Sequence, residues 1–214
     1  MRSMPSLAKA IIFSVLIGPS EFASAESNGA WVKKIARIEP DCVISAVLPA
    51  KAVLDNGFNW EIPHRRGRPA KPLSIGFECT SSAAQLASKD VRYDETSGRW
   101  NLDLDELIKI SANDADEKNW LKKWFEKNYR ITQMTLRNST GYILVDKTSN
   151  KFGSISTKDD KKGQMSGPIL LNFCLLHPPK ALCGGGVVAN KEDPDSRQLL
   201  DLVKKIILSV EFVE

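Results

Sequence analysis

Short apolar segments separated by prolines, glycines and polar turns fill most of the chain after residue 30, and their order constrains the fold more than any other feature. Within these segments β-branched and apolar residues run together or alternate with polar ones, which is typical of strands. A helical pattern interrupts the series only twice. The segments with the strand pattern are Asp41–Leu48, Leu73–Thr80, a hairpin over Val91–Leu104, Ile131–Arg137, Tyr142–Lys147, Ile169–Leu176 and Leu182–Ala189.

The two helical segments have clear beginnings. Asn113 or Asp114 can cap the first helix, and acidic residues in its first turn suit the helix dipole. Trp120, Leu121, Trp124 and Phe125 recur at helical spacing, which indicates a core-facing stripe; an exposed aromatic platform is the alternative. Pro194-Asp195-Ser196 opens the second helix, and Val210–Val213 then reads as extended. The segment Trp31–Arg37 fits either a strand or a helix.

Consecutive strands with a helix between them and a helix after them predict an α+β fold, an antiparallel sheet with helices packed against it. Residues 26–214 are long enough for a single domain of this class with a core of its own.

The first 25 residues have the pattern of a secretory signal peptide. Arg2 and Lys9 supply positive charge, and Ala10–Gly18 is a short apolar run that ends at a proline. Ala23-Ser24-Ala25 fits the cleavage rule, so the mature chain is expected to begin at Glu26. The apolar run is too short to span a membrane, and no later stretch is long enough. The sequence therefore predicts a periplasmic or secreted protein without a membrane span.

The four cysteines all follow the leader, at positions 42, 79, 174 and 183. An even number in an exported chain indicates two disulfides. Of the three possible connectivities we favour Cys42–Cys79 with Cys174–Cys183, because each pair lies on segments that can be neighbouring strands. A zinc site would need closer cysteine pairs. Four buried free thiols are the remaining alternative.

A basic segment, His64–Pro72 (HRRGRPAKP), contains Arg-Gly-Arg-Pro and resembles the AT-hook, which lies in the minor groove of DNA. An exported protein meets little DNA, and the net charge of +4 at pH 7 is mild for a nucleic-acid module. Its prolines and glycine indicate a loop between two strand-like runs. The loop is either merely solvated or a docking site for an acidic protein partner. Its candidate contact residues are Arg65, Arg66, Arg68 and Lys71.

Catalytic residues are scarce. The chain has two histidines, and the one at 177 lies three residues after Cys174, where an oxidised sulfur cannot act as a nucleophile. Asp103, Asp105 and Glu106 resemble the paired carboxylates of glycosidases, although solvated surface charges have the same spacing. No pattern of metal ligands or of cofactor binding stands out, and we expect neither.

The closing sequence DSRQLLDLVKKIILSVEFVE, a helix that runs through Ile-Leu-Ser-Val into an extended end, is similar to the C-terminus of PsbP-like α/β-sandwich proteins. This resemblance covers roughly the last eighty residues and implies a PsbP-like sandwich. Bacterial members of that group include exported and secretion-associated binding proteins, so the resemblance also implies binding rather than catalysis.

Two functions remain after this reading. The first is an exported, non-catalytic binding protein, of the inhibitor or immunity type, that occludes a toxin or hydrolase through contact with an acidic surface of its partner. The alternative is an exported carbohydrate or cell-wall hydrolase that uses the carboxylates at 103, 105 and 106.

Overall fold

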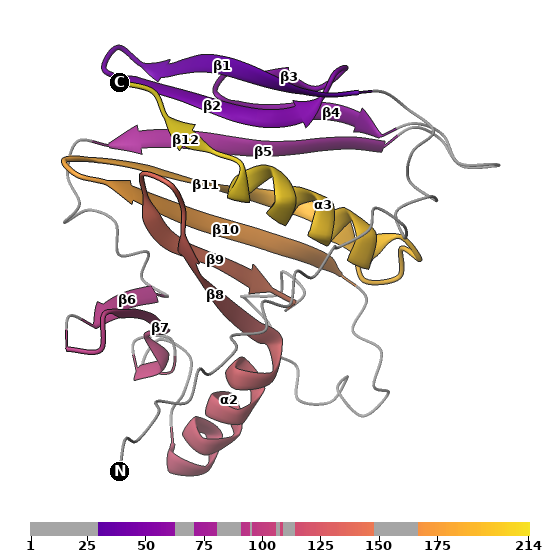
Figure 1. Ribbon diagram of the computed structural model, residues 1–214. Helices are drawn as coiled ribbons and strands as arrows, with labels where there is room; N and C mark the ends of the chain where they lie inside the picture. Colours follow the sequence, from indigo (N-terminus) through magenta and orange to yellow (C-terminus); the bar gives the residue numbers. More distant parts are fainter. Residues whose placement is uncertain are drawn as a thin grey trace, which may run out of the picture.

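The computed structural model describes residues 30–62, 71–80, 91–94, 96–105, 108, 114–147 and 167–214. These residues form three antiparallel sheets and two longer helices, which Figure 1 shows. The elements are β1 (Trp31–Glu39), β2 (Cys42–Pro49), β3 (Val53–Leu54), β4 (Gly57–Ile62), β5 (Lys71–Thr80), β6 (Val91–Asp94), β7 (Arg99–Leu102), α2 (Ala115–Asn128), β8 (Tyr129–Thr135), β9 (Thr140–Asp146), β10 (Pro168–His177), β11 (Lys180–Asn190), α3 (Ser196–Leu208) and β12 (Glu211–Phe212).

The largest sheet has seven strands in the order β3-β4-β5-β11-β10-β9-β8, and every neighbouring pair is antiparallel. Its centre is tightly packed at Gly184 on β11. A Cβ atom at that position would lie 2.1 Å from the carbonyl oxygen of Gly76 and 2.9 Å from the ring of Phe173. Only glycine allows the two strands and the ring to come this close.

One face of the seven-stranded sheet is covered by a three-stranded sheet, β1-β2-β12, and by α3 (Figure 1). The two sheets and α3 share one hydrophobic core. Ile44 and Leu48 enter it from the small sheet, Phe173 from the large sheet, and Val203 and Ile206 from the helix. Each of these side chains is at most 1% exposed. One face of the small sheet therefore packs against this core, while its other face points away from the molecule.

The opposite face of the seven-stranded sheet carries the β6–β7 hairpin and α2, which pack over its β8–β9 end. Asp114 caps α2 by accepting a hydrogen bond from the backbone N–H of Glu117, as one of the two predicted caps. Leu121 and Phe125 are buried as expected. Trp120, which was assigned to the core stripe, is instead 39% exposed and stacks on Trp124. Leu121, the next residue, is 1% exposed, so the buried face of α2 is narrower than the predicted stripe.

Two disulfides are present, Cys42–Cys79 and Cys174–Cys183, which is the connectivity favoured from the sequence. The first joins β2 of the small sheet to β5 of the large sheet. The second joins directly opposite residues of β10 and β11. No cysteine is left as a free thiol.

The observed elements confirm the predicted α+β class with an antiparallel sheet and packed helices. The turn between β10 and β11 consists of Pro178 and Pro179, as the prolines indicated. The segment Trp31–Arg37, for which both a strand and a helix fit the pattern, is a strand. Within the described ranges, no helix has the length and apolar character needed to cross a membrane.

Candidate functional site

The outward face of the three-stranded sheet presents an alternating row of apolar and cationic side chains. On β1, the residues with even numbers turn toward the core, and Ala36 and Ile38 are buried there. The residues with odd numbers point outward because successive side chains of a strand alternate between its faces. All five are exposed, and the fifth, Glu39, follows the irregularity in register after Arg37. We call the four before this irregularity the β1 row: Trp31, Lys33, Ile35 and Arg37.

Ile35 is the most exposed large apolar side chain of the described residues, at 65%, and Trp31 is 37% exposed. Val213, after β12, is also 37% exposed and lies near the same face. Single exposed apolar residues are common on protein surfaces, but several that lie together on one rigid face indicate a contact surface.

The end of α3 fixes the position of this face. The ammonium group of Lys205 lies 4.4 Å from the centre of the Trp31 ring, a cation–π contact that orients the indole. Ser209, directly after the helix, accepts a hydrogen bond of 2.9 Å from the backbone N–H of Val47 on β2. Lys34 reaches inward and donates to the carbonyl oxygens of Ala50 and Ala52. The Trp31 end of the row is thus held by a contact with α3 and not by a loop.

A hollow of about 450 Å³ opens on the same face, and we call it the Ser45 hollow. Ser45 lies between Ile35 and Glu211 in the register of the sheet. Its side chain is 0% exposed, yet its hydroxyl has no hydrogen-bond partner among the residues that the structure describes. The lining residues are Lys33, Ile35, Ser45, Arg137, Asn138, Glu211, Phe212, Val213 and Glu214.

A second polar atom of the Ser45 hollow also lacks a partner. The amide nitrogen of Asn138 donates to the carbonyl oxygen of Phe212 over 2.7 Å, which fixes the orientation of the side chain. Its Oδ1 atom makes no hydrogen bond with the described residues. Buried polar groups in proteins are usually bonded, so two unsatisfied atoms in one hollow need an explanation.

Lys33 and Glu211 form an ion pair in the hollow. Lys33 donates a hydrogen bond of 2.9 Å to Glu211, and this bond, with the nearby positive charge of Lys33, lowers the pKa of the Glu211 carboxyl. Arg137 lowers the same pKa further. A carboxyl pKa that is lower in the folded than in the unfolded protein adds stability above the pKa of the unfolded chain. The Lys33–Glu211 pair therefore persists as pH falls through the ordinary glutamate range, and its contribution is lost only below that range.

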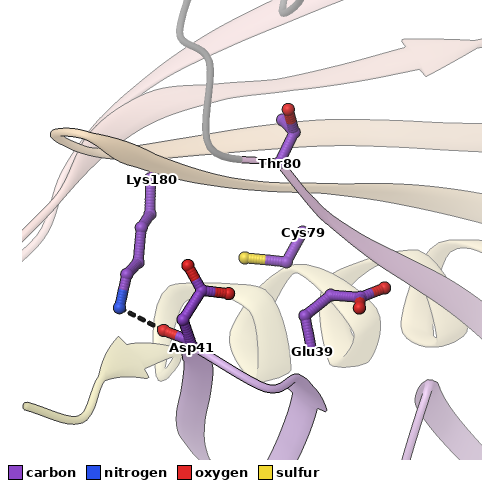
Figure 2. A pocket seen from close by; sticks show the side chains of 5 residues that line it. All are labelled: Glu39, Asp41, Cys79, Thr80 and Lys180. Carbon is purple, nitrogen blue, oxygen red and sulfur yellow. Dashed lines mark hydrogen bonds between the residues drawn. The ribbon is translucent and has the colours of Figure 1, made fainter.

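A second, smaller hollow of about 180 Å³ lies over the Cys42–Cys79 disulfide. Figure 2 shows the Cys79 sulfur directed into it, with the side chains of Glu39 and Asp41 at its rim. Lys180 closes one side by donating to the backbone oxygen of Asp41. Because the sulfur is oxidised, this hollow offers no thiolate for nucleophilic chemistry. Its lysine and its disulfide tie the tip of the β1–β2 hairpin to the large sheet.

The predicted contact residues of the basic loop are only partly placed. Arg65, Arg66 and Arg68 lie outside the described residues. Lys71 begins β5 and forms an ion pair with Asp193, before α3. Its charge is therefore already partnered, and the row of cations on β1 is a separate feature that the sequence reading did not select.

Two of the three carboxylates considered for hydrolysis are among the described residues, and neither lines a hollow. Asp103 follows β7 and is half-buried, and Asp105 is exposed. Glu106 lies outside the described residues. Neither described carboxylate lines either of the two hollows. His177 contacts the backbone oxygen of Asn138 and stacks on Phe212 at 4.8 Å, which is the structural role of a turn histidine. Across the described ranges no three metal-ligating side chains gather in one place.

Comparisons with protein-family models, with curated proteins and with solved structures give no match to this chain. The function is therefore inferred from the geometry of the β1 row and the Ser45 hollow.

Proposed function

We propose that this chain is an exported, non-catalytic binding protein of the inhibitor or immunity type, and that it holds a protein partner on the outward face of the three-stranded sheet. The partner presents an acidic contact surface with apolar side chains in it. The chain occludes that surface and performs no chemistry on it.

The observation that carries this proposal is the position of Ile35. An isoleucine that is 65% exposed lies at the centre of a rigid nine-residue strand, beside a hollow with a buried, unsatisfied serine hydroxyl. Exposed apolar area and an unmet hydrogen-bonding group both cost free energy in the isolated protein. A bound partner would remove the first of these costs by covering Ile35.

Other features are compatible with this proposal. Two disulfides suit an oxidising compartment, as the predicted leader requires. A rigid sheet suits a protein that binds without changing shape. The PsbP-like resemblance, which we retain as part of the proposal, implies a binding protein as well. The basic loop at 65–68 is a further proposed contact for acidic groups of the partner.

Charge reversal at Ile35 tests the interface. We expect Ile35→Glu to weaken the complex at least about tenfold, because it removes an apolar contact and brings a carboxylate to an acidic surface. The complex is isolated from the source cells on tagged, oxidised protein, and its dissociation constant is then measured with the purified components.

Val187→Glu is the matched control. Val187 is also an exposed β-branched residue in a strand, at 47%, but it is on β11 opposite Leu170, on the other face of the large sheet. Its variant should bind normally. Equal losses in both variants, or none in either, would refute the proposed interface. Release of cell-wall fragments by the purified protein would instead favour the hydrolase.

Ser45→Ala separates stability from binding. Removal of a buried hydroxyl without a partner should raise the free energy of unfolding by about 1 kcal/mol. Because the hydroxyl is covered in the free protein, the same change should leave the dissociation constant of the complex within about twofold. Urea unfolding and a binding titration check the two parts. A destabilised variant with unchanged affinity would show that the hydroxyl serves the fold.

A further inference from the structure

Within the described ranges, β1 has one edge without a neighbouring strand, which we call its free edge. In the three-stranded sheet the order is β1-β2-β12, so the described part of the chain gives β1 a neighbour on one side only. A strand edge carries a row of backbone N–H and C=O groups that can pair with another strand. Here the edge is nine residues long, which is enough for several such pairs.

The hydrogen bonds of the sheet show which residues face the free edge. The backbone N–H of Ala50 donates to the oxygen of Ala30, just before β1, so residues with even numbers bond to β2. The N–H of Val213 donates to the oxygen of Val43, so the odd-numbered residues of β2 bond to β12 and its even-numbered residues bond to β1. In an antiparallel pair the bonded and non-bonded positions alternate. The backbone groups of residues 31, 33, 35 and 37 therefore point to the free edge.

These four residues are also the β1 row. The same positions thus offer free backbone groups at the edge and exposed side chains on the outward face. A strand that paired with them would place its own side chains directly beside theirs, because opposite residues of an antiparallel pair share a face.

We propose that the partner adds an extended segment to the free edge of β1. The proposal builds on the proposed function and specifies how the partner is held. In this segment acidic side chains lie opposite Lys33 and Arg37, and apolar side chains lie opposite Trp31 and Ile35. Backbone hydrogen bonds supply affinity, and the alternating side chains select the sequence.

The charges of β1 favour an acidic segment. Arg37 makes no hydrogen bond or ion pair with any other described residue, so its guanidinium is available for a carboxylate. Lys33 donates a hydrogen bond to Glu211, but its ammonium group has three donors and can donate another to a second carboxylate. The segment that fits has acidic and apolar residues in turn at every second position.

The same charges disfavour a second copy of this chain. If two β1 strands paired antiparallel about Ile35, Lys33 of one copy would lie opposite Arg37 of the other. The register centred on Ile35 therefore brings cations of the two copies together on both sides of the centre. Like charges directly opposite each other destabilise a strand pair, and charged edges are a common protection against self-association.

A synthetic peptide tests the pairing. The probe is the capped heptapeptide Glu-Thr-Val-Thr-Glu-Thr-Trp, and the control probe has lysine in place of both glutamates. Binding to the purified, oxidised protein is followed by NMR. We expect the first peptide to bind at least about tenfold more tightly than the control. It should slow amide exchange at residues 33, 35 and 37, whereas residues 34 and 36 are protected already.

Two variants isolate the backbone contribution. Lys33→Pro removes an N–H that faces the free edge and keeps the bonds to β2, as proline does on edge strands. Lys33→Ala removes the same side chain and keeps the N–H. Lys33→Pro should bind the first peptide at least about tenfold more weakly than Lys33→Ala. Retained amide protection at residues 34 and 36 shows that β1 is intact in the Lys33→Pro variant. If this protection is lost, the amide exchange of the unmodified protein with the first peptide tests strand addition instead.

Several results would overturn strand addition: equal binding by the two variants, equal binding of the two peptides, or no new protection at residues 33, 35 and 37. A dimer in light scattering that Lys33→Pro abolishes would show that the edge binds a second copy. If Ile35→Glu disrupts the natural complex while the two Lys33 variants bind equally, the proposed function stands and strand addition fails. If Ile35→Glu has no effect, the proposed function itself fails.

Discussion

Replacement of Cys42 and Cys79 by alanine is expected to lower the free energy of unfolding by about 4 kcal/mol. The two residues are 37 apart in sequence, and a cross-link of that span restricts the unfolded chain by roughly this amount in the chain-entropy model. The bond also joins the two sheets that enclose the main core. Urea unfolding of the double variant, compared with the oxidised protein, measures the loss.

The second disulfide provides the control. Cys174 and Cys183 are 9 residues apart, and the same model gives a smaller loss of about 3 kcal/mol. Because β10 and β11 are already paired along ten positions, their hairpin should keep its register without the bond. A larger loss for this pair than for the first would contradict the view that Cys42–Cys79 fastens the small sheet to the large one.

Truncation of Phe173 should have an effect of similar size. The side chain is 1% exposed at the centre of β10, and its ring meets the ring of Phe77 edge to face at 5.5 Å. Phe173→Ala leaves a cavity between the large sheet and the layer above it, and such changes cost about 3–5 kcal/mol. The change in the urea midpoint, at an unchanged slope, measures this cost.

Phe173→Leu is the milder comparison, because it keeps most of the apolar volume and should cost less than about 2 kcal/mol. The exposed Trp120, replaced by alanine, should cost less than about 1 kcal/mol, since exposed positions tolerate change. A loss at Trp120 as large as that at Phe173 would mean that the exposed end of α2 belongs to the core.

The strands and helices followed from the sequence where local signals were strong. Asp114 capped α2 and the prolines at 178 and 179 made the β10–β11 turn, because both effects depend on a few neighbouring residues. Cys174 and Cys183 were predictable partners for the same reason. The division of the strands between two stacked sheets did not follow, because it depends on which apolar faces meet in space.

The candidate site was harder to predict. Trp31–Arg37 is amphipathic with either a period of two or a helical period, so the outward row on β1 became visible only once the strand was established. The unsatisfied hydroxyl of Ser45 has no signal in the sequence, since hydrogen bonding of a buried serine depends on residues distant in the chain. The charges of the basic loop form a clear sequence signal because they lie close together in the chain. The outward cations of β1, Lys33 and Arg37, give no such signal because Ile35 and Ala36 lie between them.

Photo-crosslinking from two positions tests the proposed binding face most directly. A photoreactive amino acid is placed at position 35 or, as the control, at position 187, in the full-length chain produced in its source cells. Both native residues are exposed and apolar, but they lie on opposite faces of the large sheet. A single crosslinked protein from position 35 and none from position 187 is the expected result. Crosslinks from 187 alone, or from neither position, would contradict a partner on the three-stranded sheet.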